Sequence, residues 1–211
     1  MRKELKKKKR IKLRNKRLIK RYPWLCPADW YGNPIKKLDY TYTWFGNINR
    51  GWAKAFGMMM IHEIDEILKK AHCENDLTII QIKEKFGSLT IYFSAPHEVY
   101  QPVQRVIDKY SHLSENICAL CGKPDIFMTF SGWNFPLCKS CWDKHMNDKR
   151  TYEEVISDKD TGRMADSYTI RRFSTEGTQD TTYDISDTAE RIRKRYEKRC
   201  ERSARRLQRL G

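Results

Sequence analysis

Four cysteines are the residues of this chain best suited to chemistry. They form two pairs, Cys118-x2-Cys121 and Cys138-x2-Cys141, with sixteen residues between the pairs. Two residues within a pair allow one tight turn to present both sulfurs to a single ion, and four thiolates hold zinc tetrahedrally at about 2.3 Å. The spacing therefore predicts one Zn2+ ion. We expect that ion to be structural, because four thiolates leave no coordination position open for a substrate.

Other fates of these cysteines are two disulfides or four free thiols. Disulfides fit a secreted protein, and the charged N-terminal stretch of this sequence lacks the apolar run expected of a secretory signal. His145 lies four residues after Cys141 and could replace one cysteine as a ligand; otherwise it is an exposed helix residue. Gly122 follows the first pair, where the turn calls for a positive backbone angle. The remaining cysteines are isolated and are interpreted as free thiols: Cys26, Cys73 and Cys200.

The motifs of known catalytic sites are incomplete in this sequence. HNH nucleases also carry paired cysteines, but they need histidine between the pairs, and residues 122–137 contain none. The run from His62 to Glu66 resembles the zinc-protease motif H-E-x-x-H, with Glu66 in place of the second histidine. A solvent-exposed helix position is the simpler interpretation of His62. We therefore predict a protein that is not an enzyme.

The net charge of +15 is concentrated at the two ends of the chain. Residues 1–21 hold thirteen Lys or Arg and one Glu, a net +12, and residues 188–211 hold ten and three, a net +7. Residues 22–150 carry a net +1, and residues 151–187 carry a net −5. Such density at the ends indicates a polyanionic partner, with solvated tails as the alternative.

Both basic ends have helical character in the sequence. Residues 1–21 lack Gly and Pro and could become helical against a partner, although neighbouring like charges oppose a free helix. Residues 188–210 read as a helix capped by Asp187 or Thr188, with Glu190 in its first turn. The candidate nucleic-acid contacts of the first end are Lys6, Lys7, Lys8, Lys9, Arg10, Lys12, Arg14, Lys16 and Arg17. Those of the second end are Arg191, Arg193, Lys194, Arg195, Lys198, Arg199, Arg202, Arg205 and Arg206.

The body between the ends shows both helical and strand periodicity. Met60, Ile64 and Leu68 recur at helical spacing, whereas Ile80 and Ile82 alternate as in a strand. The predicted elements are turns over 22–50, a helix over 51–72, a hairpin of 77–85 and 88–94, a helix over 97–113, a hairpin of 125–130 and 133–137, and a helix start at 142–147. This order predicts an α+β fold, a small helix-hairpin-helix domain followed by a zinc-ribbon or treble-clef module.

Composition divides the chain into five predicted parts. A polar, acidic stretch separates the cysteine module from the last basic segment, and Ser167–Phe173 within it could form a short strand. The predicted parts are a basic arm (1–21), an α+β domain (22–117), a zinc-ribbon module (118–150), an acidic linker (151–187) and a basic helix (188–211).

A smaller basic face could form on the first hairpin. Lys83, Lys85 and Arg105 could lie beside Tyr92 or Phe93, and exposed aromatic rings beside cations can stack nucleic-acid bases. The alternative is that the aromatic rings point into the core and the lysines are solvated.

Several motifs occur in fixed order over residues 22–142. They are Gly51-Trp-Ala-Lys-Ala-Phe-Gly57, Ile80-Gln-Ile-Lys-Glu-Lys-Phe-Gly-Ser-Leu89, Tyr110-Ser-His-Leu-Ser114, Cys118-x-x-Cys-Gly-Lys-Pro124, Gly132-Trp133 and Cys138-x-x-Cys141. On these motifs the chain resembles a family of uncharacterised zinc-ribbon proteins of bacteriophages and prophages. The resemblance implies a phage protein acting in the cytoplasm of a bacterial host, with the virion as another location. It implies no biochemical function, and both basic ends lie outside it.

Two functions agree with these observations. The first is a zinc-stabilised, non-enzymatic protein that binds DNA, RNA or a nucleoprotein complex through its basic termini. The alternative is a protein–protein interaction factor, an inhibitor or modifier of a host machine or a virion component, that docks through the zinc module. We expect no membrane partner, since no apolar run approaches eighteen residues.

Overall fold

The computed structural model resolves the chain into two compact units that interleave along the sequence. One unit comprises Met1–Asn49, Gly57–Lys85 and Leu89–Asp108; the other comprises Arg50–Phe56, Phe86–Ser88 and Lys109–Gly211. These units cross the domain boundaries predicted from composition, because the segment at 50–56 belongs with the cysteine module. The structure describes residues 2–29, 35, 40–126, 128–131, 133–145, 167–174 and 177–209.

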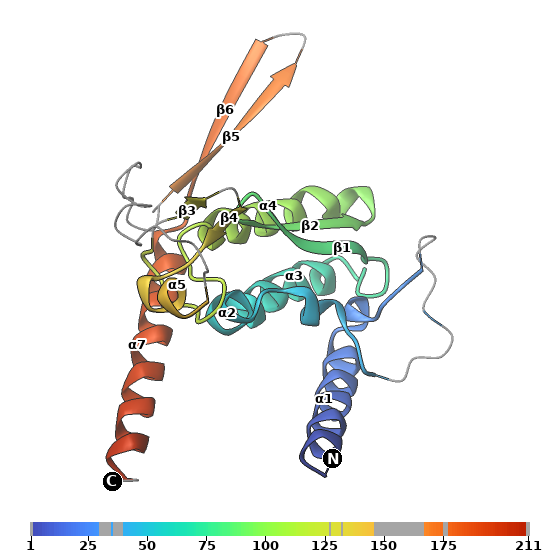
Figure 1. Ribbon diagram of the computed structural model, residues 1–211. Helices are drawn as coiled ribbons and strands as arrows, with labels where there is room; N and C mark the ends of the chain where they lie inside the picture. Colours follow the sequence, from blue (N-terminus) through green and yellow to red (C-terminus); the bar gives the residue numbers. More distant parts are fainter. Residues whose placement is uncertain are drawn as a thin grey trace. The chain divides into compact units, whose positions relative to one another are not determined.

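The described elements alternate helices with two-stranded hairpins, in agreement with an α+β fold (Figure 1). The helices are α1 (Arg2–Arg21), α2 (Arg50–Trp52), α3 (Met58–Lys70), α4 (His97–Ser114), α5 (Lys139–His145) and α7 (Ser186–Gln208). The strands are β1 (Thr78–Lys85), β2 (Ser88–Ser94), β3 (Met128–Ser131), β4 (Trp133–Pro136), β5 (Ser167–Ser174) and β6 (Gly177–Asp184). Short turns of helix, η1 (Pro23–Leu25), η2 (Trp44–Asn47) and the π-helical η3 (Ala53–Gly57), complete the described set.

The predicted helix over 51–72 is present but divided. The π-helical turn η3 separates α2 from α3, and in α3 the side chains of Met60, Ile64 and Leu68 are buried as the spacing predicted. In the first hairpin Ile82 is buried, whereas Ile80 is 45% exposed and its neighbour Ile79 takes the core position. The expected alternation therefore fails in β1 at Ile80.

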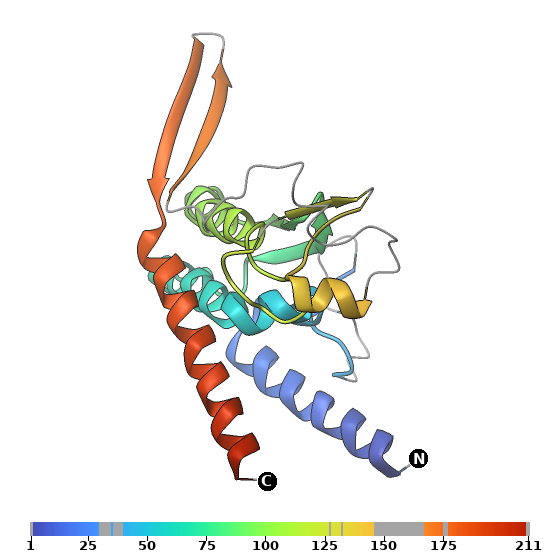
Figure 2. The same cartoon turned by 60° about the vertical axis from the view of Figure 1, so that its left-hand side comes forward.

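The first basic segment is a continuous helix, α1, that ends at Arg21 (Figure 2). One buried polar contact ties its middle to the rest of its unit: Asn15 Nδ2 donates to the Tyr40 carbonyl at 2.8 Å. At its end, the N–H of Tyr22 continues the helical pattern onto the Leu18 carbonyl at 2.8 Å, and Tyr22 is buried. Tertiary anchoring of this kind offsets the like-charge repulsion that opposes a free helix.

The prediction of a linker over 151–187 needs correction. Strands β5 and β6 form an antiparallel hairpin with Ser167 opposite Asp184 and Ser174 opposite Gly177. The strand suggested at 167–173 is confirmed, but its partner was missed because Gly177–Asp184 is polar and lacks the apolar alternation of a half-buried strand. Residues 151–166 lie outside the described part.

Helix α7 begins at Ser186, and neither Asp187 nor Thr188 caps it as predicted. The helix-start position is Ile185, which makes no side-chain cap. The carboxylate of Asp184 instead accepts the backbone N–H of Ser186 at 2.8 Å. This backbone hydrogen bond lowers the pKa of Asp184. Among the described residues, no helix is both long and apolar enough to span a bilayer.

Candidate metal centre

The first cysteine pair lies in a tight backbone turn. The Cys118 N–H donates to the Lys123 carbonyl and the Gly122 N–H donates back to the Cys118 carbonyl, each at 2.8 Å. Gly122 has a φ of +78°, a conformation that a side chain disfavours, so the predicted positive angle is confirmed. Cys118 is fully buried and Cys121 is partly buried.

The second cysteine pair lies at the start of helix α5, directly after hairpin β3–β4. Cys138 precedes the helix and its carbonyl accepts the N–H groups of Cys141 and Trp142, both at 2.9 Å. Trp142 is buried beside the cysteines together with Leu137. A helical turn therefore spaces the second pair, whereas a backbone turn spaces the first.

The two turns bring all four sulfurs together. Their Sγ atoms lie within 4.8 Å of one another, and those of Cys121 and Cys138 are 3.6 Å apart. A tetrahedral zinc site with bonds of about 2.3 Å has sulfur–sulfur edges of about 3.8 Å. A disulfide would need about 2.05 Å. The four cysteines form no disulfide, and their cluster could hold one metal ion. Cys26, Cys73 and Cys200 are also free thiols, but they lie outside this cluster.

The electrostatics of the cluster favour a cation. A hydrogen bond from Cys121, together with backbone hydrogen bonds, lowers the pKa of Cys118 to about 4. The bond to Cys118 and burial raise the pKa of Cys121. Burial and the neighbouring Cys118 thiolate raise the pKa of Cys141 to about 12. In the protein alone, one thiolate suppresses the ionisation of its neighbours, and a divalent cation would reverse that by attracting all four.

His145 is not a member of the described cluster. It is the last residue of α5 and its side chain is exposed. The candidate ligand set among the described residues is therefore four cysteines, a soft donor set that could hold one metal ion.

A glycine and a tryptophan far upstream brace the first cysteine turn. The Gly51 N–H donates to the Ala119 carbonyl at 2.7 Å, and the buried Trp52 donates its Nε1–H to the Ile117 carbonyl at 2.8 Å. A Cβ added to Gly51 would overlap the carbonyl oxygen of Cys118 and lie 2.6 Å from that of Ala119. The sequence alone predicts no structural role for the Gly51–Gly57 motif, because no local pattern links residues some 65 positions apart.

Helix α7 also packs on the cysteine module. Ile192 is fully buried, and Arg193 forms an ion pair with Asp125 at 3.1 Å with its side chain only 15% exposed. Arg199 donates from its guanidinium to the carbonyls of Cys121 at 3.0 Å and Gly122 at 3.3 Å. Two cations predicted to bind nucleic acid, Arg193 and Arg199, are therefore occupied in holding the module.

The other predicted cations remain on the surface. On α1 all nine are exposed, namely Lys6, Lys7, Lys8, Lys9, Arg10, Lys12, Arg14, Lys16 and Arg17. On α7 seven are exposed, namely Arg191, Lys194, Arg195, Lys198, Arg202, Arg205 and Arg206. The structure therefore separates structural from accessible cations, a distinction that composition could not make.

Two weaker candidates have simpler explanations. His62, Asp65 and Glu66 come close enough to hold an ion, but the buried Asp65 is paired with Lys69 at 2.6 Å. On the first hairpin Lys83 lies 5.0 Å above the exposed ring of Tyr92. Phe93 points inward and stacks on Tyr100, so the aromatic part of the predicted basic face is limited to one ring.

Comparisons with known proteins do not assign this site. No family model, no curated protein and no solved structure matches the chain. The interpretation of the site therefore rests on its own geometry and chemistry.

Proposed function

We propose that this is a zinc-stabilised, non-enzymatic protein that binds nucleic acid, alone or within a nucleoprotein complex, through its basic helices. The observation that carries the proposal is the exposure of every candidate cation along α1, where Glu4 is the one acidic residue. A dense row of exposed cations neutralises phosphates and releases counterions, which is the main source of affinity for nucleic acids. Such contacts position the protein without reading sequence.

The order of elements around the cysteines supports a treble-clef module. A cysteine turn, a hairpin (β3–β4) and a helix (α5) whose first turn supplies the last ligand follow one another. Zinc is the metal we infer, because four thiolates are its common structural set. When bound, zinc supplies four bonds that hold the turn and the helix together. The cysteine turn and the residues that follow it form part of the surface on which α7 packs.

Two further observations support the parts of the proposal that concern chemistry and setting. The segment between the cysteine pairs holds no histidine, so the acid–base group of a cysteine-rich nuclease is missing from its usual place. The motif resemblance to phage and prophage proteins supports a setting in the cytoplasm of a bacterial host.

The test uses charge neutralisation in the full chain, because deleting α7 would remove buried residues such as Ile192. One variant changes Lys6, Lys9, Arg10 and Arg17 to Gln; a second changes Arg195, Arg202, Arg205 and Arg206 to Gln; a third combines both. Binding to duplex and single-stranded DNA and RNA is measured by fluorescence anisotropy over a range of salt. For a duplex, each lost phosphate contact should reduce the salt slope by about 0.9 and weaken binding at low salt.

A control variant changes Lys70 and Lys144 to Gln; these are two exposed lysines outside the basic ends. It should bind as tightly as the unmodified chain. Unchanged binding in the combined variant, or no nucleic-acid binding by the intact chain, would refute the proposal. A protein partner that survives nuclease and high salt would then favour the interaction factor.

A further inference from the structure

Over residues 8–21 of α1, the arginines and the lysines lie on different sides of the helix. Four arginines, spaced by four, three and four residues, fall within about 60° of one another, since each residue advances about 100°. We call them the arginine row: Arg10, Arg14, Arg17 and Arg21. Four lysines of the same segment occupy a different side, about 150° away. We call them the lysine face: Lys8, Lys9, Lys12 and Lys16.

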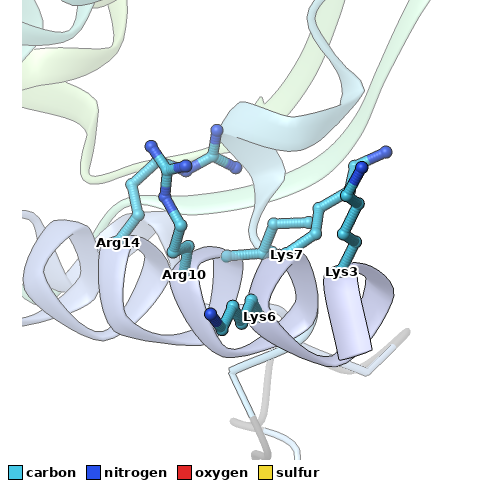
Figure 3. A pocket seen from close by; sticks show the side chains of 6 residues that line it. Lys3, Lys6, Lys7, Arg10 and Arg14 are labelled. Carbon is cyan, nitrogen blue, oxygen red and sulfur yellow. The ribbon is translucent and has the colours of Figure 1, made fainter. Parts of the chain in front are cut away.

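A groove runs along the arginine row. It has a volume of about 420 Å³, and its lining includes the apolar residues Leu18 and Met58, which we call its apolar floor. A second groove of about 750 Å³ continues it toward the start of the helix, where Lys3, Lys6 and Lys7 join Arg10 and Arg14 (Figure 3). Cations above an apolar floor match a sugar–phosphate backbone, which has charged phosphates on one side and sugar carbons on the other.

Two arginines of the row are held in place before any ligand binds. Arg14 donates from its guanidinium to Asn15 Oδ1 at 3.1 Å, and Asn15 is itself anchored to the Tyr40 carbonyl. The Arg21 guanidinium lies 5.3 Å from the centre of the Tyr22 ring. Arginines ordered in advance lose less side-chain entropy on binding, and arginine grips phosphate with two parallel hydrogen bonds, which lysine cannot do.

An exposed apolar residue of α1 lies between the two basic faces. Leu13 is 51% exposed and lies about 160° around the helix from the buried Asn15. The helix therefore presents an apolar tip flanked by arginines on one side and lysines on the other. A helix with side chains is about 10–12 Å wide, and the major groove of B-form DNA is about 12 Å wide with a phosphate backbone on each wall.

We propose that α1 binds in the major groove of duplex DNA, an inference that rests on the proposed function and names its ligand. The arginine row binds the phosphates of one strand, whose sugars contact the apolar floor of the groove beside Met58. The lysine face lies toward the other strand. Leu13 points to the base edges, where a thymine methyl group is its apolar complement.

The same geometry disfavours other polyanions. The major groove of an RNA duplex is too narrow for side chains to enter, so an RNA duplex cannot take the helix in this way. An anionic membrane would need a continuous apolar face on the outer side, but Ile11, Leu18 and Ile19 are half-buried in the protein. Leu5 and Leu13 alone remain exposed among the apolar residues described in α1.

The first test measures binding of the full, zinc-loaded chain to a 20-base-pair DNA duplex, the same duplex as RNA, and vesicles of anionic lipid. We expect the DNA duplex to bind at least about ten-fold more tightly than the RNA duplex. A major-groove competitor, methyl green, should displace the protein, and a minor-groove competitor, netropsin, should not. Equal affinity for the two duplexes, displacement by netropsin alone, or preference for vesicles would overturn the major-groove proposal.

The second test holds charge constant. The variant R10K/R14K/R17K/R21K keeps every charge but loses two-point phosphate contacts, so DNA affinity should fall about ten-fold. The reciprocal variant K8R/K9R/K12R/K16R should bind at least as tightly as the unmodified chain. R10K/R17K spares the Asn15 and Tyr22 contacts and should show an intermediate loss, with circular dichroism verifying the helix.

The outcomes separate this inference from the proposed function. If both charge-conserving variants bind DNA as tightly as the unmodified chain, the arginine row has no special role, and α1 acts only through its total charge. If DNA and RNA bind alike but both weaken when the ends are neutralised, the proposed function stands and the major-groove inference fails. If neither nucleic acid binds, the proposed function itself fails.

Discussion

Helices α1 and α7 both carry dense positive charge, and they differ in what their side chains contact. Among the residues of α1 whose burial is described, only Asn15 is buried, and the cations face solvent. On α7, Thr188, Ala189 and Ile192 are buried and Arg199 holds two backbone carbonyls of the cysteine turn. Net charge therefore does not show whether a basic helix binds a partner or stabilises its own fold. The decisive feature is the set of groups that each cation contacts.

The difference extends to the metal. Helix α7 packs on the module that contains the four-cysteine cluster, so if the cluster holds a metal ion, the order of α7 should depend on that ion. Helix α1 belongs to the other compact unit. Five changes can break or sharpen this contrast.

The largest expected effect follows loss of one metal ligand. Cys118→Ser should unfold the cysteine module and release α7, because structural zinc binding contributes on the order of 10–16 kcal/mol to folding. Limited proteolysis should then cut within α7 while α1 retains its resistance. Cys200→Ser, which changes an exposed cysteine, is the control and should retain one zinc per chain. Equal protease resistance of α7 with and without the metal would break the contrast.

The next effect tests the brace beneath the first cysteine pair. Gly51→Ala should lower the free energy of unfolding by about 3 kcal/mol or more, because the new Cβ would collide with the backbone of Cys118 and Ala119. Gly46→Ala is a matched control, since nothing lies within 4 Å of the added carbon. Chemical denaturation of the zinc-loaded protein measures both. A tolerated Gly51→Ala would show that the close approach is not required.

A core truncation tests how firmly α7 is packed. Ile192→Ala should cost about 2–3 kcal/mol, as expected for a fully buried isoleucine. Leu207→Ala removes a side chain of the same helix that is 71% exposed, and its effect should stay within about 0.5 kcal/mol. Similar small costs for both variants would mean that α7 is as loosely held as a solvated tail.

A single cation on each helix sharpens the comparison further. Arg199→Gln removes the guanidinium from the carbonyls of Cys121 and Gly122, so stability should fall by about 1–2 kcal/mol. Arg17→Gln, on the exposed side of α1, should change stability by less than about 0.5 kcal/mol and instead weaken DNA binding. Thermal unfolding and anisotropy, measured on both variants, give the two readouts. The reverse pattern would exchange the roles assigned to the two helices.

The smallest effect concerns pH. Because the pKa of Asp184 is lowered in the folded protein by the Ser186 N–H, its stabilisation of the α7 start is present above the ordinary aspartate value. It should be lost as the pH falls below the ordinary aspartate pKa and through the lowered one. Asp184→Asn should remove this part of the pH dependence of stability. Hydrogen exchange of the backbone amides in the first turn of α7, measured over a range of pH, tests this. An identical pH profile in both proteins would rule out this contribution.

Local patterns predicted several features correctly. The spacing of Cys118 and Cys121 predicted a paired turn, and Gly122 predicted its positive backbone angle, because both depend on bonds among neighbouring residues. The helical periodicity of Met60, Ile64 and Leu68 predicted the buried face of α3 for the same reason. Strand β6 was missed, because its sequence is polar and lacks the apolar alternation that marks a half-buried strand.

The sequence by itself determined the paired spacing of the four cysteines, the order of the first two hairpins and the helices around them, and the concentration of charge at the two ends. These follow from residue types and short spacings, which act within a turn or two of chain. Only the tertiary structure placed Gly51 against the cysteine turn, assigned Arg193 and Arg199 to the support of the module, and left the arginine row of α1 on the surface. Those outcomes depend on contacts between residues about 65 or more positions apart, or on which side of a helix is buried, and no local pattern encodes them.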